Sequence, residues 1–349
     1  MPLAPKTLTD LIAHDFDTVI DVRAPSEFDE DHIPGAINLP VLTDKERARV
    51  GTIYVQESPF LARKIGAALV AKNAASHIEG PLADKDGGWR PLVYCWRGGQ
   101  RSGSFAAILG QIGWRVQVID GGYRAWRRLV KSTLYDGPIT QRLVLLDGNT
   151  GTAKTDLLGR LEARGVQVIN LEGLAAHRGS ALGAQGEQPS QKAFETGVAA
   201  RLASFDPTRP ILVEAESSKI GRINLPPAFF HAMKNAPRIE VTASVPVRAD
   251  FLVEAYSDMS GDPSQLEAGL NKLVRLQGRE TVEQWKSMAS AGALKDLAAD
   301  LITRHYDPRY AKARDRVGAD RIAVHHAETL DEAGREALAD RVAETLSRL

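Results

Sequence analysis

The sequence predicts an α/β protein of two domains, each built on a parallel sheet. A short apolar run leads into a Gly-rich turn and then an apolar-periodic helical stretch at residues 91–112, and the same order recurs at residues 142–163. Strand, loop and helix in that order are typical of parallel α/β units. The chain has 349 residues, which suits two domains of roughly 100–200 residues each.

Asp136-Gly137-Pro138 lies between the two units, and Gly and Pro favour the end of a helix and the start of an extended segment. We therefore expect a first domain over residues 1–136 and a second over 138–349, the second with added helices. The predicted strands, in order, are 18–22, 91–95, 116–120, 142–146, 166–169, 210–214 and 238–241. The predicted helices are 102–112, about 155–163, a charged helical region over 247–290 and an amphipathic helix over 330–349.

Composition narrows the class of protein. Hydrophobic residues make up 43% and charged residues 25%, which excludes a wholly disordered, collagen-like or coiled-coil chain. The single cysteine, Cys95, excludes an intramolecular disulfide, a CxxC redox pair and a Cys-rich zinc site. No apolar run approaches the ~18–20 residues of a membrane span, and the N-terminus lacks a signal-peptide core. We expect a cytoplasmic protein with no membrane partner.

Cys95 stands between a predicted buried strand and a helix N-terminus, where backbone N–H groups and the helix dipole favour a thiolate. Arg97 and Arg101 add positive charge. The amides of the intervening loop form a cup that also suits a phosphate-like group. The expected loop residues are Gly98, Gly99 and Gln100.

The spacing from Cys95 to Arg101 is Cys-x5-Arg, which is one residue longer than the loop of common sulfurtransferases and resembles that of Cys-dependent phosphatases. One alternative is therefore a phosphatase in which Cys95 attacks phosphorus and Arg101 holds the equatorial oxygens. The wider loop also admits attack on a chalcogen carried by a phosphate.

A second loop, residues 148–155, nearly fits G-x-x-x-x-G-K-[ST] and follows an apolar strand. Its amides can cradle a diphosphate, Lys154 supplies a charge and the Thr155 hydroxyl can reach Mg²⁺. Ala153 stands where glycine is usual, so a positive φ there would strain the loop. The expected diphosphate-binding residues are Gly148, Asn149, Thr150, Gly151, Thr152, Lys154 and Thr155.

Glu214 and Glu216 end the strand predicted at 210–214, and either could contact a metal-bound water. Solvated acids at a strand terminus are an equally good interpretation of each one alone.

The first half resembles a rhodanese domain in Asp21-Val22-Arg23, in Glu27-Phe28, in residues 32–38, in the Cys95 loop and in residues 120–126. With the phosphate-binding loop in the same chain, the combination resembles the tRNA 2-selenouridine synthase family, a rhodanese domain fused to a P-loop domain. The further matching segments are residues 94–104, 172–180, 188–191, 213–221 and 305–310.

That resemblance implies a transferase acting on wobble 2-thiouridine, position 34, in tRNAs for Lys, Glu and Gln. The sulfur would be alkylated by geranyl diphosphate and then replaced by selenium from selenophosphate, with Cys95 carrying selenium as S-selanylcysteine. The phosphate-binding loop would hold the diphosphate without ATP hydrolysis. The implied partners are the tRNA anticodon loop and an enzyme that supplies selenophosphate.

Four residues are weaker candidates for substrate contact. Trp96 can stack on a flipped base or pack under the loop. The others lie in a polar segment after a strand, where a structural role is as common as a functional one: His177, Arg178 and Ser180. Asp307 and Tyr310 fall in an Asp-Pro segment, for which we predict a helix-ending turn.

Lys+Arg and Asp+Glu are both 44, a balance that argues against a globally basic nucleic-acid binder. By segment, however, the formal net charge is −5 for residues 1–89 and +7 for residues 90–131. A local patch can steer an anticodon loop even when the net charge is nil.

A third interpretation is a non-catalytic, nucleotide-regulated RNA-binding adaptor, for which Ala153 is the best evidence.

Overall fold

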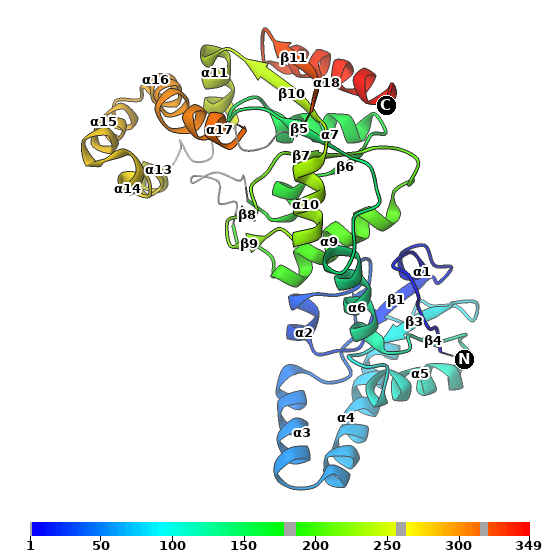
Figure 1. Cartoon of the computed structure of the whole chain (residues 1–349). Coiled ribbons are helices and arrows are strands. Elements are labelled where there is room, and N and C mark those ends of the chain that lie inside the picture. Colours follow the sequence, from blue (N-terminus) through cyan, green and yellow to red (C-terminus); the bar gives the residue numbers. More distant parts are fainter. Residues whose placement is uncertain (1, 178–185, 256–262, 315–319) are drawn as a thin grey trace. The chain divides into compact units, whose positions relative to one another are not determined.

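The computed structural model describes residues 2–177, 186–255, 263–314 and 320–349. It divides into two compact units, one made of Met1–Gly137 with Pro189–Ser204 and the other of Pro138–Gln188 with Phe205–Leu349. Both are mixed α/β with parallel sheets (Figure 1). The sequence-based division placed all of 138–349 in the second domain, so the structure differs in assigning residues 189–204 to the first unit.

The first unit has a parallel sheet in the order β2-β1-β3-β4. Its central strand β3 is buried along its whole length, because helices cover the sheet and apolar residues face both ways. Consequently the residue after β3, Cys95, starts from a rigid support. The strands are β1 (Thr18–Asp21), β2 (Ile37–Asn38), β3 (Pro91–Tyr94) and β4 (Gln117–Val118).

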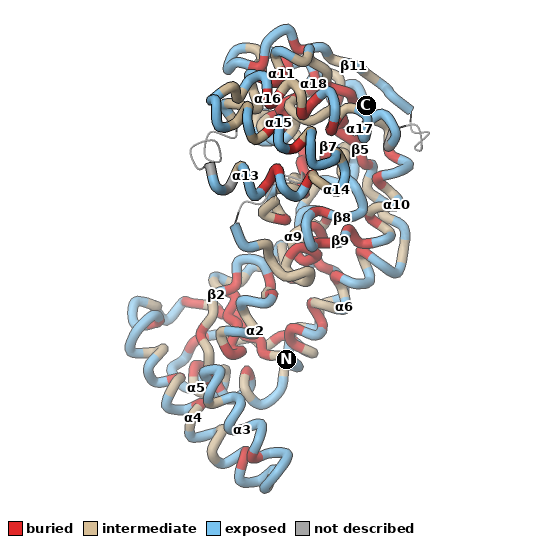
Figure 2. Tube along the Cα trace, turned by 90° about the vertical axis from the view of Figure 1, so that its left-hand side faces the viewer, coloured by how far each residue is buried: buried red, intermediate tan, exposed pale blue. Residues whose placement is uncertain are grey.

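The helices of the first unit begin at recognisable signals. The Thr43 and Ser58 hydroxyls accept hydrogen bonds from first-turn amides of α3 and α4, and Pro59 begins α4. Figure 2 shows that α3 and α4 are exposed along most of their length. The helices are α1 (Thr9–Ile12), α2 (Pro25–Glu30), α3 (Asp44–Gln56), α4 (Pro59–Glu79), α5 (Gln100–Ile112), α6 (Gly122–Tyr135) and α9 (Gln191–Ser204).

The second unit has a parallel sheet in the order β11-β10-β5-β7-β6. The edge strand β11 was not expected from the sequence. Its residues are mostly exposed or half-buried, so it lacks the apolar run that marks a central strand. The strands are β5 (Leu143–Asp147), β6 (Gln167–Ile169), β7 (Ile211–Glu214), β10 (Arg238–Ala243), β11 (Arg321–Ala327) and the antiparallel pair β8 (Lys219–Ile220) and β9 (Ile223–Asn224).

In the part of the chain that the structure describes, three apolar clusters support the second unit, and the smallest joins Ala249, Ala298 and Ile302. One lies around the sheet, where α18 packs against α7 and β11. Another surrounds the buried Trp285 in the helical region. The helices are α7 (Lys154–Ala163), α8 (Leu171–Leu174), α10 (Pro227–Asn235), α11 (Val245–Ala255), α13 (Pro263–Asn271), α14 (Val274–Gln277), α15 (Arg279–Ser290), α16 (Leu294–Leu301), the π-helix η1 (Ile302–Tyr306), α17 (Asp307–Arg314) and α18 (Glu332–Ser347). Among the described residues, no helix is both long and apolar enough to span a membrane.

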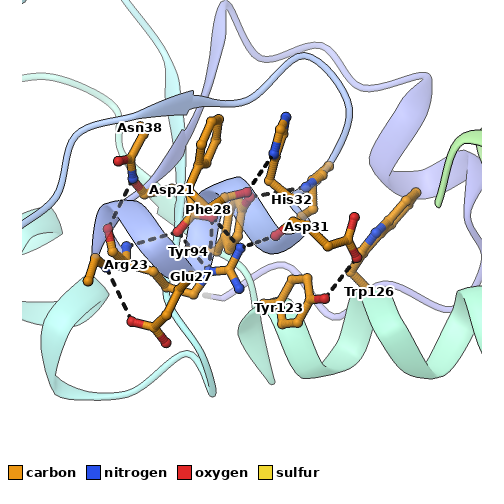
Figure 3. A network of polar contacts seen from close by, with 12 residues as sticks. Asp21, Arg23, Glu27, Phe28, Asp31, His32, Asn38, Tyr94, Tyr123 and Trp126 are labelled. Carbon is orange, nitrogen blue, oxygen red and sulfur yellow. Dashed lines mark hydrogen bonds and ion pairs between the residues drawn. The ribbon is translucent and has the colours of Figure 1, made fainter. Parts of the chain in front are cut away.

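Helix α9 is tied to the first unit by a buried polar network. The Trp126 indole N–H donates to the Thr196 hydroxyl at 3.2 Å, and that hydroxyl donates to Asp31 at 3.0 Å. Tyr123 donates to the same Asp31 carboxylate at 2.8 Å (Figure 3). Burial raises the pKa of Asp31, opposed by these hydrogen bonds and by Arg127. A helix from the later half of the chain thus satisfies polar groups inside the first unit.

Replacing Thr196 by Val keeps the side chain's shape but leaves Trp126 and Asp31 each without one partner. Unsatisfied buried polar groups are costly, so we expect Thr196→Val to lower the free energy of unfolding of the first unit by about 1–3 kcal/mol. Urea denaturation followed by tryptophan fluorescence measures this. Thr196→Ser keeps the hydroxyl and should lose clearly less. Equal losses in the two variants would contradict the network's role.

Candidate active site

The cysteine loop is shaped by close backbone contacts. Cys95 follows β3 directly and is 3% exposed, and α5 begins five residues later with Gly99 as its N-cap. Gly98 has φ +67°, and a Cβ there would lie 2.5 Å from the Ile119 carbonyl oxygen. Gly122 has φ +54°, and a Cβ there would overlap the Cys95 carbonyl oxygen. Only glycine fits at these two positions.

Two hydrogen bonds join the cysteine loop to the start of α6. The Tyr123 N–H donates to the Cys95 carbonyl at 2.8 Å, and the Arg124 N–H donates to the Trp96 carbonyl at 3.1 Å. The half-buried Trp96 also packs on the Tyr123 ring, with centroids 5.3 Å apart. The first turn of α6 therefore fixes the loop behind the thiol.

The thiol sits among hydrogen-bond donors. The Ser102 hydroxyl donates to Cys95 Sγ at 3.1 Å from the first turn of α5. Burial acts to raise the pKa of Cys95, but hydrogen bonds from Ser102 and the Arg97 N–H, with the charge of Arg101, leave it below its ordinary value. A lowered pKa makes the thiolate, the nucleophilic form, more abundant.

The two loop arginines are in different environments. Arg101 is half-buried and paired with Glu27, at 2.7 Å, and Glu27 also contacts Arg47 at 3.0 Å. Burial acts to raise the pKa of Glu27, but the arginines and the Ala24 N–H hold it below its ordinary value. Arg97 is exposed. Arg101 is already paired with the Glu27 carboxylate. This pairing does not favour the alternative of a Cys-dependent phosphatase, in which Arg101 would hold phosphate oxygens.

The buried polar network of the first unit continues around Arg23 (Figure 3). Arg23 and Asp21 form an ion pair at 2.6 Å with side chains 1% and 0% exposed. Arg23 also donates to the Asp31 carbonyl at 2.7 Å and lies 3.9 Å from the centre of the Tyr123 ring. The Tyr94 hydroxyl accepts from the Ile33 N–H at 3.1 Å. These contacts fix the end of β1 beside the residues that hold Cys95.

The second loop has the form of a phosphate-binding loop. It joins β5 to α7, with Gly151 at φ +85° and Ala153, the α7 N-cap, at φ +60°. Position 153 does take a positive φ, the case in which strain was expected from the sequence, and alanine adopts it. Lys154 Nζ donates to the Gly148 carbonyl at 2.6 Å. A Cβ on Gly148 would lie 2.7 Å from the Val241 carbonyl, so glycine is required there too.

Three carboxylates gather beside this loop. The Thr155 hydroxyl donates to Glu172 at 2.6 Å, and the Glu172 N–H donates to Glu214 at 2.5 Å. Burial, followed by the charge of Glu172, raises the pKa of Glu214 well above its ordinary value and that of Glu216 to about 7, with Lys154 opposing. Both predicted acids therefore lie near the loop, and Glu172 joins them.

The loop is also held from the helical region. Buried Arg248 of α11 donates to the Thr150 carbonyl at 2.9 Å and to both oxygens of Asp307, at 3.0 and 2.6 Å. Asn149 donates to Asp307 at 2.9 Å. The predicted helix-ending turn at Asp307 is wrong: Asp307 begins α17 directly after the π-helix η1, and Pro308 sits in the first helical turn, where no amide is needed. Lys154 Nζ lies 5.6 Å from the Tyr310 ring centre.

The side chains beside the phosphate-binding loop determine which metal ion could bind there. No group of three or more His, Cys, Asp or Glu side chains among the described residues has the arrangement of a metal site. The Thr155 hydroxyl and neighbouring carboxylates are oxygen donors, the kind that Mg²⁺ takes while keeping substrate oxygens and water as its other ligands. The residues thus suit an ion shared with a bound diphosphate.

The structure also places the remaining predicted site residues. Gln100 starts α5 and is exposed, as is Gly99. The Thr152 hydroxyl donates to the Asn149 carbonyl at 2.8 Å, inside the loop. His177 is half-buried, and burial lowers its pKa. Arg178 and Ser180 lie outside the described residues.

Sequence reasoning gave no role to Glu172, Ser102, Glu27 or Arg248. A hydroxyl in the first turn after the cysteine loop could have suggested Ser102. The contacts of Glu27 and Arg248 join segments far apart in the chain, so no local pattern points to them.

Together, a thiolate-favouring cysteine loop on one parallel sheet and a phosphate-binding loop on another define a class: two-domain α/β proteins that join a rhodanese-like domain to a P-loop-like domain. The family models agree. A rhodanese-like domain matches residues 4–129, and the tRNA 2-selenouridine synthase AAA domain matches residues 141–274.

Curated relatives named tRNA 2-selenouridine synthase cover most of the chain. The protein of Nitrosomonas europaea is 37% identical over 81% of this chain and 76% of its own. That of Bdellovibrio bacteriovorus is 35% identical over 81% and 79%, and that of Shewanella denitrificans 33% over 84% and 87%. The chain belongs to the tRNA 2-selenouridine synthase family.

Ser102→Ala removes a hydrogen bond to the Cys95 thiolate and should raise the pH midpoint of Cys95 alkylation by iodoacetamide by roughly one unit. The wild-type midpoint should lie below that of an ordinary thiol. Ser104→Ala is the matched control, because Ser104 is exposed on the same helix. Unchanged midpoints in both variants would contradict the role of Ser102.

Glu216, with a pKa of about 7, should make anion binding at the second loop pH-dependent. Below pH 7 its carboxyl is neutral, and above pH 7 its negative charge opposes a bound diphosphate. From pH 6 to pH 8, the affinity for inorganic diphosphate should fall up to about tenfold further in the wild type than in Glu216→Gln. Calorimetry measures both, and ionisation of the diphosphate itself cancels in the ratio. Parallel pH profiles would show that Glu216 does not titrate there.

Proposed function

We propose that this chain is a tRNA-modifying selenotransferase that converts wobble 2-thiouridine to 2-selenouridine through S-geranyl-2-thiouridine, in tRNAs for Lys, Glu and Gln. The observation that carries the proposal is the pairing, in one member of this family, of a thiolate-favouring Cys95 and a formed phosphate-binding loop at Lys154. Its curated relatives are named tRNA 2-selenouridine synthase, which supports the formation of 2-selenouridine in tRNA.

The phosphate-binding loop serves the first step. The thiocarbonyl sulfur attacks C1 of geranyl diphosphate, and the diphosphate leaves with the bonding electron pair. The loop amides and the Lys154 ammonium stabilise the charge that develops on it. Mg²⁺ bound between the diphosphate and Thr155 would add to this, and no ATP hydrolysis is needed.

The cysteine loop serves the second step. A thiocarbonyl sulfur is a poor leaving group, whereas geranylthiolate departs readily once selenium attacks C2. Cys95 would carry selenium as S-selanylcysteine, and its lowered pKa keeps the thiolate available. Water takes the phosphoryl group of selenophosphate, which leaves as phosphate, and a disulfide accepts the two electrons released when the S–Se bond forms. Once selenium is bound to C2, a thiol reduces the S–Se bond and restores the Cys95 thiolate. We expect a separate enzyme to supply the selenophosphate for this step.

Lys154→Ala tests the first step, because it removes the charge at the diphosphate. Purified protein is incubated with thiolated tRNA, geranyl diphosphate and selenophosphate, singly and together, and the nucleosides are read by mass spectrometry. Geranylation should fall at least 100-fold, while selenation of a supplied S-geranyl tRNA continues. Lys234→Ala, an exposed lysine of α10, is the control. Full geranylation by Lys154→Ala would refute the assignment.

Cys95→Ala tests the second step in the same assay. Selenation should stop while S-geranyl-2-thiouridine accumulates, since the diphosphate site is intact. Loss of both steps would contradict this division of labour. An unaltered 2-thiouridine peak in every combination with wild-type protein would defeat the proposed function.

A further inference from the structure

Helix α6 carries a column of basic side chains. Arg124, Arg128 and Lys131 follow one another at spacings of four and three residues, which places them on one face of the helix. All three are exposed. The other side of α6, including Tyr123 and Trp126, is buried in the first unit. We call these three cations the α6 basic column.

The basic residues of segment 90–131 include both paired and unpaired side chains. Arg101 is paired with Glu27, and Arg127 is paired with Glu195 and lies 3.6 Å from Asp31. The α6 basic column, in contrast, forms no ion pair within the described ranges. Paired arginines are neutralised and help to hold the fold. The unpaired, solvated cations are available to an anion from outside.

The column begins at the cysteine loop. The Arg124 N–H donates to the Trp96 carbonyl at 3.1 Å, one residue from Cys95. Arg97, in the same loop, is also exposed. Seven residues of helix from Arg124 to Lys131 rise about 10 Å along the axis. An extended polyanion bound along this face would thus have one end beside the cysteine loop.

We propose that the α6 basic column binds the phosphate backbone of the tRNA anticodon loop and sets the nucleotide to be modified beside Cys95. This rests on the proposed function. RNA fits because it is a continuous polyanion, because contacts to phosphates position without reading sequence, and because the segment 90–131 concentrates +7 charges in a neutral chain. The acidic residue of segment 90–131, Asp120, precedes α6 and is exposed.

The test compares two triple variants of the full chain that lose the same charge. One is Arg124→Gln, Arg128→Gln, Lys131→Gln; the control is Lys45→Gln, Lys64→Gln, Lys72→Gln, which are exposed lysines of α3 and α4. Affinity for an anticodon stem-loop with 2-thiouridine at position 34 is measured from 50 to 300 mM salt. Far-UV circular dichroism and thermal midpoints check that both variants fold.

The column variant should bind roughly 10- to 100-fold more weakly near physiological salt, and its slope of log affinity against log salt should be shallower by about 2, since each phosphate contact contributes roughly 0.7. The control should keep the wild-type slope. A column variant that keeps the wild-type slope, or a control that loses as much, would overturn the inference. If wild-type protein binds through the column but modifies no 2-thiouridine, the proposed function fails and the RNA surface stands.

Discussion

The cysteine site depends on one backbone contact, the approach of the Cys95 carbonyl to Gly122. The contact is close enough that a Cβ on Gly122 would occupy the carbonyl's place, so it requires glycine and leads directly into α6. The next residue, Tyr123, donates through its N–H to Cys95 and through its hydroxyl to Asp31. Because Asp31 also binds Thr196 of α9, the position of the thiol is coupled to a helix that the chain supplies about 100 residues later.

The phosphate-binding loop is held in an analogous way. Its own sequence provides the glycines and Lys154, but its outer turn is fixed by Arg248 and Asp307 from the helical region. Arg248 is buried, and an unpaired buried guanidinium would be costly, so the bidentate pair with Asp307 is what allows it to reach the Thr150 carbonyl. In each unit, the residues that bear the chemistry are local in sequence and the residues that position them are distant.

This separation explains what the sequence could predict. The Cys95 and Lys154 loops combine strand, glycine and helix within a few residues, so local sequence predicts them, whereas the positive φ of Ala153 is known only from the structure. The membership of α9 in the first unit has no local signal, because Thr196 and Glu195 look like ordinary polar helix residues until Trp126 and Asp31 face them. Likewise Asp-Pro at residues 307–308 suits a turn or a helical first turn, and only the contact with Arg248 decides between them.

The contrast between local sequence and distant contacts also applies to the charged residues near Cys95. A count of arginines near Cys95 suggests one basic cup, yet the structure divides them by partner. Hydrogen bonds from Ser102 lower the pKa of Cys95 more than the charge of Arg101 does, and Glu27 neutralises much of what Arg101 could offer an incoming anion. The thiolate is therefore stabilised mainly by neutral donors. Under the proposed function, such an arrangement leaves selenophosphate and RNA phosphates to be attracted by cations at the surface, and a polyanion would then bind beside the cysteine loop without changing the hydrogen bonds to the thiol.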